Sequence, residues 1–216
     1  LIFSLLAVLL YLGASIYQTR CLIQRLAANA SILRATGLAA LLAHGCSLYL
    51  QLITDTGLAL GFFNAASLVA WLVIAVTLLS SFRAPVLSLL LGLYPLALVT
   101  VLLAWLFPGH GTLLVPGEGV LVAHILLSIL AYGILTIAAF QAGLLGIQNY
   151  QLKHKHPTRF IRTFPPLQTM ERLLFQFLLC GELLLTLALV TGFVFLDNMF
   201  TQDVAHKTLL SCLAWV

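Results

Sequence analysis

The segment from residue 86 to residue 107 reads VLSLLLGLYPLALVTVLLAWLF and contains no charged side chain. A helix of about 20 apolar residues is long enough to cross the hydrocarbon core of a lipid bilayer. A strand of a membrane barrel would instead alternate apolar and polar residues, and this run does not. Because a helix also satisfies its backbone hydrogen bonds internally, the segment predicts a transmembrane helix.

The rest of the 216-residue chain has the same character, with 62% hydrophobic and 7% charged residues and a mean hydropathy of +1.12. A soluble domain is about a quarter charged, so the composition excludes a soluble enzyme, a disordered chain and a secreted disulfide scaffold. We expect an all-α fold, a polytopic transmembrane helix bundle that forms one integral membrane domain over residues 1–216. We expect seven visible spans, the first and last cut short, and eight spans in the full-length protein. The predicted spans are residues 1–17, 35–53, 62–82, 86–107, 120–147, 173–196 and 204–216.

The ten basic residues are distributed unevenly among the connections between these spans. If the seven helices alternate in direction, nine of the basic residues lie on one side of the bilayer, and Lys207 lies on the other. Because basic loops stay in the cytoplasm, we expect the N-terminus outside, with loops 54–61, 108–119 and 197–203 on the outer face. We interpret the basic run 153–159 as an anchor near anionic lipid headgroups, with a docking site for a cytoplasmic protein as the alternative. The lipid bilayer is thus the immediate partner, and nucleic acid is not an expected one.

Two ionisable residues, His44 and Glu182, lie inside predicted spans at matching depth. Each is about nine residues from the cytoplasmic end of its span, or about 13 Å at the rise of an α-helix. An ionisable side chain in a span is costly unless it faces the bundle interior with a partner. We therefore hypothesise that Glu182 pairs with His44 near the midplane. The alternative is that each residue bonds separately to hydroxyl or backbone groups.

His124 and His206 form a second pair, near the outer ends of the predicted spans 120–147 and 204–216. Two imidazoles from separate helices at one membrane face can supply both axial ligands of a haem iron. Ser128 and Tyr132 follow His124 by one and two helical turns, where they would support the ring or line a cavity. One alternative is a structural role for each interfacial histidine. The other is a zinc site, but the sequence has no H-E-x-x-H motif or tight His/Cys cluster.

These residues resemble motifs of the cytochrome-c-assembly (CcsA-type) family over nearly the whole chain. His44 followed by segment 61–68 resembles that family's second and third spans, in which a transmembrane His precedes an Asn-containing turn. Segment 124–132 looks like its His-x-x-x-Ser-x-x-x-Tyr span, and segment 184–195 is similar to the Gly-containing helix that follows. The HemX-like, YpjD-type branch of small inner-membrane proteins is the most similar, because parts of 149–172 resemble its cytoplasmic connection.

The resemblance implies a haem-handling protein of the bacterial inner membrane, with haem as cofactor and haem-biosynthesis or cytochrome-maturation proteins as partners. By position, His44 matches the family's transmembrane His, His124 its outer-side His, and His206 its second outer segment. The full assembly factors carry a Trp-rich outer segment, whereas residues 197–203 of this chain contain no Trp. The resemblance therefore favours haem binding or an accessory role in haem supply over direct transfer to apocytochrome c. In this interpretation, His124 and His206 ligate the iron, and His44 with Glu182 forms a second, deeper site through which haem passes.

Two other classes of function are compatible with the same residues. A small-molecule or proton-linked transporter would use His44 and Glu182 as a midplane relay, although no internal repeat is visible. A membrane scaffold that regulates haem biosynthesis would dock a cytoplasmic enzyme through residues 148–172. An enzyme is the least favoured class, because no Ser/His/Asp set, phosphate loop or paired carboxylate site is visible.

Overall fold

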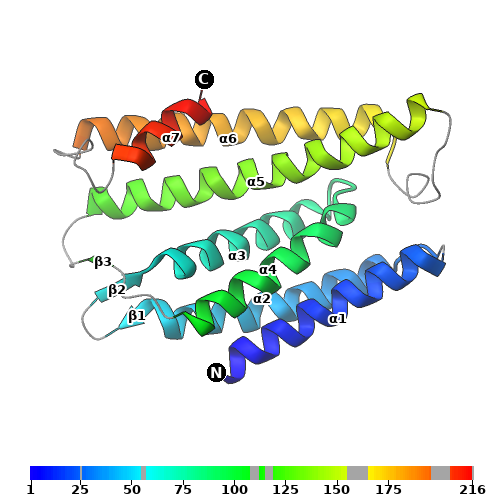
Figure 1. Cartoon of the computed structure of the whole chain (residues 1–216), viewed down its shortest axis with the longest axis horizontal. Helices are drawn as coiled ribbons and strands as arrows, with labels where there is room; N and C mark the ends of the chain where they lie inside the picture. Colours follow the sequence, from blue (N-terminus) through cyan, green and yellow to red (C-terminus); the bar gives the residue numbers. More distant parts are fainter. Residues whose placement is uncertain are drawn as a thin grey trace.

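The structure is a computed structural model of the chain and describes residues 1–24, 26–54, 57–107, 112–114, 119–154, 165–195 and 205–215. It confirms the predicted all-α helix bundle (Figure 1). The α-helices of the described residues are α1 (Ile2–Gln24), α2 (Ala30–Leu52), α3 (Phe62–Ser80), α4 (Leu90–Leu106), α5 (Gly119–Lys153), α6 (Leu167–Phe195) and α7 (Ala205–Trp215). A short 3-10 helix, η1 (Leu87–Leu89), leads directly into α4.

Six of the described helices, α1 to α6, are long and apolar enough to cross a membrane. By contrast, α7 has only 11 residues. Four helices extend well beyond the apolar segments that predicted them. α1 continues to Gln24 and α5 to Lys153, while α2 already begins at Ala30 and α6 at Leu167. An apolar run marks the part of a helix that fits the hydrocarbon core, whereas backbone hydrogen bonding can continue into the headgroup region. Hydropathy therefore underestimates the length of these four helices.

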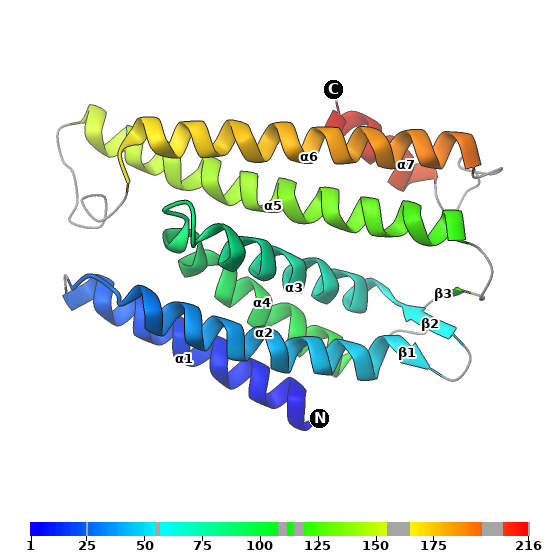
Figure 2. The same ribbon diagram turned by 180° about the vertical axis from the view of Figure 1, so that it is seen from behind.

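The helices form two groups that lie side by side (Figures 1 and 2). In the first group, α1 packs against α2 and α4, and α3 packs against the same two helices. In the second group, α5 and α6 pack along each other, and α7 lies against α6. The main contact between the groups is that of α3 with α5. Gly133 of α5 permits this close approach, because a Cβ atom at that position would lie 3.1 Å from Cδ2 of Leu72.

The hydrophobic core lies mainly in the first group, between α1, α2, α3 and α4. Tyr94 of α4 is fully buried there, and its hydroxyl donates to the carbonyl of Leu33 on α2, 2.9 Å away. Gly37, one turn further along α2, makes this bond possible, because a Cβ atom would collide with the Tyr94 hydroxyl. His44 is buried in the same group with 1% of its surface exposed. The close packing of this group therefore surrounds one of the predicted site residues.

The connections at one end of the bundle form a small antiparallel sheet that the sequence did not predict (Figure 2). β1 (Ile53–Thr54) pairs with β2 (Gly57–Leu60), and β2 pairs with β3 (Thr112–Leu114). The sheet joins the connection between α2 and α3 to the connection between α4 and α5. Strands of two to four residues are too short to show the alternating pattern from which strands are predicted.

Candidate functional site

His124, in the second turn of α5, is held by the backbone of α6. Its Nδ1 lies 2.9 Å from the carbonyl oxygen of Ala188 and 3.2 Å from the hydroxyl oxygen of Thr191. A carbonyl oxygen only accepts, so Nδ1 carries the proton and donates it to Ala188. The lone pair of the neutral imidazole is then on Nε2, to which no described residue bonds.

This arrangement is the one that metal-binding histidines use. A ligating imidazole usually donates its second ring N–H to a carbonyl or carboxylate, which fixes the tautomer and the ring orientation. The His124 side chain is half-buried. The contact with Ala188 therefore fixes the tautomer of His124 and leaves Nε2 as the ring nitrogen with a lone pair.

The hydroxyls of Ser128 and Tyr132, predicted to support the His124 ring or to line a cavity, bond to groups other than the imidazole. The hydroxyl of Ser128 donates to the backbone carbonyl of His124, 2.8 Å away, within α5 itself. The hydroxyl of Tyr132 lies 2.5 Å from the hydroxyl of Ser211 and so joins α5 to α7. Tyr132 therefore holds α7 against α5, whereas the Ser128 hydroxyl bonds within α5.

The helix α7 is fixed at a second point as well. The indole Nε1 of Trp215 donates to the hydroxyl of Thr186 on α6, 2.9 Å away. Together with the bond between Tyr132 and Ser211, this contact holds α7 along the α5–α6 pair. Figure 1 shows α7 beginning at the end of the bundle where α5 begins and α6 ends.

His206 lies in the first turn of α7, and its side chain is outside the described part of the structure. Its depth can be compared with that of His124 through the bond between Tyr132 and Ser211. His124 precedes Tyr132 by eight residues, or about 12 Å of helix, and His206 precedes Ser211 by five, or about 7.5 Å. Because α5 and α7 begin at the same end, the two histidines lie within about one helical turn of the same depth.

His44 is in a different environment, at the centre of the first group of helices. Its Nδ1 lies 3.3 Å from the hydroxyl of Tyr11 on α1, and its Nε2 lies 2.9 Å from the hydroxyl of Ser67 on α3. The Tyr11 ring also meets the imidazole edge to face, with 5.8 Å between the ring centres. Both ring nitrogens of His44 are thus engaged with hydroxyl groups, and neither is free to bind iron.

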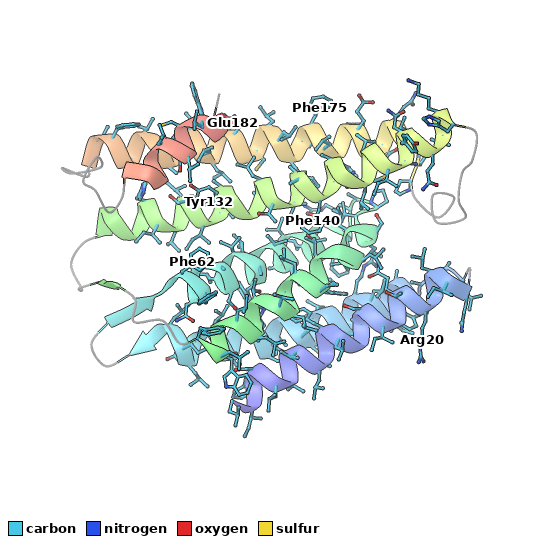
Figure 3. The ribbon with its side chains drawn as sticks, in the orientation of Figure 1. Arg20, Phe62, Tyr132, Phe140, Phe175 and Glu182 are labelled. Carbon is cyan, nitrogen blue, oxygen red and sulfur yellow. The ribbon has the colours of Figure 1, made fainter. Side chains whose placement is uncertain are left out.

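The hypothesis that Glu182 pairs with His44 is wrong. His44 bonds to Tyr11 and Ser67, and Glu182 belongs to α6, which packs against α5 and α7 in the other group. Figure 3 shows Glu182 on α6 near the end of α7. Equal depth in the bilayer fixes the height of a side chain but not which helices surround it. The transporter interpretation, which needed this pair as a relay, loses its structural basis.

The comparisons with known proteins agree with this architecture. Residues 32–216 match the family model described as cytochrome C assembly protein. The chain belongs to the cytochrome c assembly family. It is 36% identical over 179 residues to the inner membrane protein YpjD of Escherichia coli (strain K12). The aligned segment covers 82% of this chain and 67% of that protein.

A second relative of this cytochrome c assembly family member is an uncharacterized 28.8 kDa protein in the nifR3-like 5′ region of Azospirillum brasilense. The identity is 35% over 95 residues, or 43% of this chain and 35% of that protein. No solved structure matches the chain. The resemblance of the sequence to the YpjD-type branch is therefore confirmed by sequence comparison.

Haem is the cofactor that the resemblance implies for this cytochrome c assembly family member, and the histidines differ in how well they fit it. The donor set at His124 fits, because Nδ1 is held by a carbonyl and Nε2 keeps a lone pair. The His44 environment does not fit, since both nitrogens are bonded and the ring is buried. Among the described side chains, no group of three or more His, Cys, Asp or Glu residues gathers to hold a free metal ion.

Sequence reasoning missed the groups that decide these roles, namely the carbonyl of Ala188 and the hydroxyls of Tyr11 and Ser67. Ser67 and Thr191 lie in the segments 61–68 and 184–195 that carry the family resemblance, but no pattern in the sequence connects them to the histidines. Other predictions fall partly or wholly outside the described residues, namely the basic run after Lys153, the docking loop 148–172 and the outer loop 197–203.

Proposed function

We propose that this protein handles haem in the bacterial inner membrane, in an accessory role in cytochrome c assembly or haem supply. The observation that carries the proposal is the bond from Nδ1 of His124 to the carbonyl of Ala188, which leaves Nε2 as the ligating atom. Membership of the cytochrome c assembly family supports it, and the relative YpjD is described as an inner membrane protein. Proteins of cytochrome maturation or haem biosynthesis are the corresponding partners.

His206 is the proposed second ligand. The support for this role is the position of α7, which Tyr132 and Trp215 hold against α5 and α6 at the depth of His124. Bound haem would supply an iron with two axial positions, and the polarity around it would decide its reactivity. The residues of this chain contribute two imidazoles, a backbone carbonyl that fixes one tautomer, and two side-chain bonds that order the helix of the second ligand.

We propose that the site faces the outer side of the membrane. Exposed basic residues occupy the ends of α1, α5 and α6 that gather at one end of the bundle, and the partly buried Arg34 lies near the same end of α2 (Figures 1 and 2). Basic residues next to spans stay in the cytoplasm, so this end is the cytoplasmic one. His124 lies near the opposite end, at the start of α5. In this topology, residues 1–216 form a single integral membrane domain.

The experiment that tests the function is a haem titration of the purified full chain in detergent, followed by the Soret absorbance. The wild-type protein should bind haem, and His124→Ala should lose the low-spin spectrum of two histidine ligands. The matched control is His154→Ala, directly after the end of α5, because this exposed imidazole bonds to the carbonyl of Tyr150 and to no other residue that the structure describes. The control should titrate like the wild type. A wild-type protein that stays colourless with added haem would overturn the proposal.

A further inference from the structure

Thr191 of α6 lies against the ring of His124, and the proposed function assigns this threonine no role. Its Oγ1 lies 3.2 Å from Nδ1 of His124, and the carbonyl oxygen of Ala188 lies 2.9 Å from the same nitrogen. Thr191 follows Ala188 by three residues, so the two lie on the same face of α6. Two oxygen atoms of α6, one from the backbone and one from a side chain, are therefore within hydrogen-bond distance of a single ring nitrogen.

The hydroxyl proton of Thr191 determines what its oxygen can offer to the imidazole. Oγ1 lies 2.9 Å from the carbonyl oxygen of Leu187 and 2.9 Å from that of Ala188, and both carbonyls only accept. The hydroxyl has one proton, so it donates to one carbonyl at a time. Because Nδ1 of His124 already carries a proton, Oγ1 can only accept from it. Donation to Leu187 leaves the carbonyl of Ala188 to the imidazole and adds a lone pair of Oγ1 as its second acceptor.

An N–H that is shared between two acceptors holds the imidazole more firmly than one carbonyl would. Hydrogen bonds are directional, so a second acceptor beside the first restricts rotation of the ring about the Nδ1 bond. Bonds of this kind orient a ligating imidazole and increase the electron density that it donates to a metal. They are also one of the means by which a protein sets the potential of haem iron. Of the two acceptors, only the Thr191 hydroxyl belongs to a side chain, so a substitution can remove it.

We propose that Thr191 is a positioning residue of the haem site, which holds the His124 ring and, through the shared Nδ1 proton, increases electron donation from Nε2 to the iron. This inference rests on the proposed function. Stronger donation stabilises ferric over ferrous iron, so the Thr191 hydroxyl keeps the reduction potential of bound haem low. Loss of the hydroxyl should shift that potential to a more positive value.

Three substitutions separate the effect of this hydroxyl from other effects. Thr191→Val keeps the branched shape and removes the oxygen, whereas Thr191→Ser keeps the oxygen. The matched control is Thr100→Val in the spanning helix α4. The Thr100 hydroxyl donates to the carbonyl of Ala97, 2.9 Å away, and bonds to no histidine that the structure describes. The control therefore removes a similar bond within a helix and leaves the His124 environment unchanged.

The first measurement is the reduction potential of the haem-loaded full chain in detergent, followed by absorbance during stepwise reduction. We expect a more positive potential in Thr191→Val and the wild-type potential in Thr191→Ser and Thr100→Val. Haem affinity should fall about threefold in Thr191→Val, as expected for one hydrogen bond between membrane helices. An unchanged potential in Thr191→Val would overturn the proposal. A shift of equal size in Thr191→Ser would also overturn it, because that variant keeps the hydroxyl.

The second measurement needs no haem, so failure of this inference can be distinguished from failure of the proposed function. In the haem-free chain with isotope-labelled histidine, NMR reports how fast the Nδ1 proton of His124 exchanges with water, and the spectrum of His124→Ala assigns the signal. The exchange should be faster in Thr191→Val than in the wild type and unchanged in Thr191→Ser. Equal rates in the wild type and Thr191→Val would overturn the positioning role.

A wild-type chain that binds no haem would overturn the proposed function and, with it, the effect on the iron. The exchange rate would still show whether Thr191 holds the ring. Should Thr191→Val fail to fold, Thr191→Ala takes its place in both measurements, because it also lacks the hydroxyl.

Discussion

The two bonds that hold α7 allow a quantitative test of the proposed pair of haem ligands. Tyr132→Phe removes the bond to Ser211, and Trp215→Phe removes the bond to Thr186. Hydrogen bonds between membrane helices contribute about 0.6 kcal/mol each on average. Since α7 must be ordered before His206 can bind iron, each change should weaken haem binding about threefold. The double variant should bind about eightfold more weakly if the two bonds act independently.

The assay is a titration of the purified full chain with haem, in which the dissociation constant is fitted from the Soret absorbance. Tyr150→Phe is the control, because Tyr150 lies at the other end of α5 and its ring contacts His154. This control should bind haem like the wild type. The spectrum of each variant reports whether two histidines still ligate the iron.

Two results would contradict this prediction. If the double variant bound haem as tightly as the wild type, while His124→Ala did not bind, α7 would not contribute to the site and the second ligand would lie elsewhere. If Tyr132→Phe alone abolished binding, the effect would be too large for one interhelical hydrogen bond. Tyr132 would then contact the haem directly.

Two further predictions concern the first helix group. Gly37→Ala should lower the free energy of unfolding by about 1–3 kcal/mol, because the added methyl group displaces the Tyr94 hydroxyl from its carbonyl partner. Thermal denaturation in detergent measures this change. The control is Gly13→Ala, because a Cβ atom at position 13 meets nothing within 4 Å. Equal stability of the two variants would contradict the prediction. His44→Ala should also cost about 1–3 kcal/mol, since two buried hydroxyls lose their partner. Its haem titration should not change, and loss of the Soret band in this variant would instead identify His44 as a ligand.

The sequence predicts where each helix lies along the chain better than it predicts which helices and side chains are in contact. The run 86–107 corresponds to η1 and α4, because hydropathy and backbone hydrogen bonding are both local properties. The same reasoning placed His124 near the start of α5. It failed for the pair of His44 and Glu182, where it used equal depth as evidence of contact. It also gave no sign of the small sheet, whose strands are too short to form a pattern.

Hydropathy and residue order are enough to predict that this chain is a bundle of membrane-spanning helices and how far along its helix each of the few ionisable residues lies. Both follow from the order of residues along one helix, since each residue adds a fixed rise. Which ring nitrogen of each histidine keeps its lone pair depends on contacts between helices. The carbonyl of Ala188 leaves Nε2 of His124 available, whereas hydroxyl groups from two other helices occupy both nitrogens of His44. The order and rotation of packed helices set these contacts, and they depend on residues far apart in the chain.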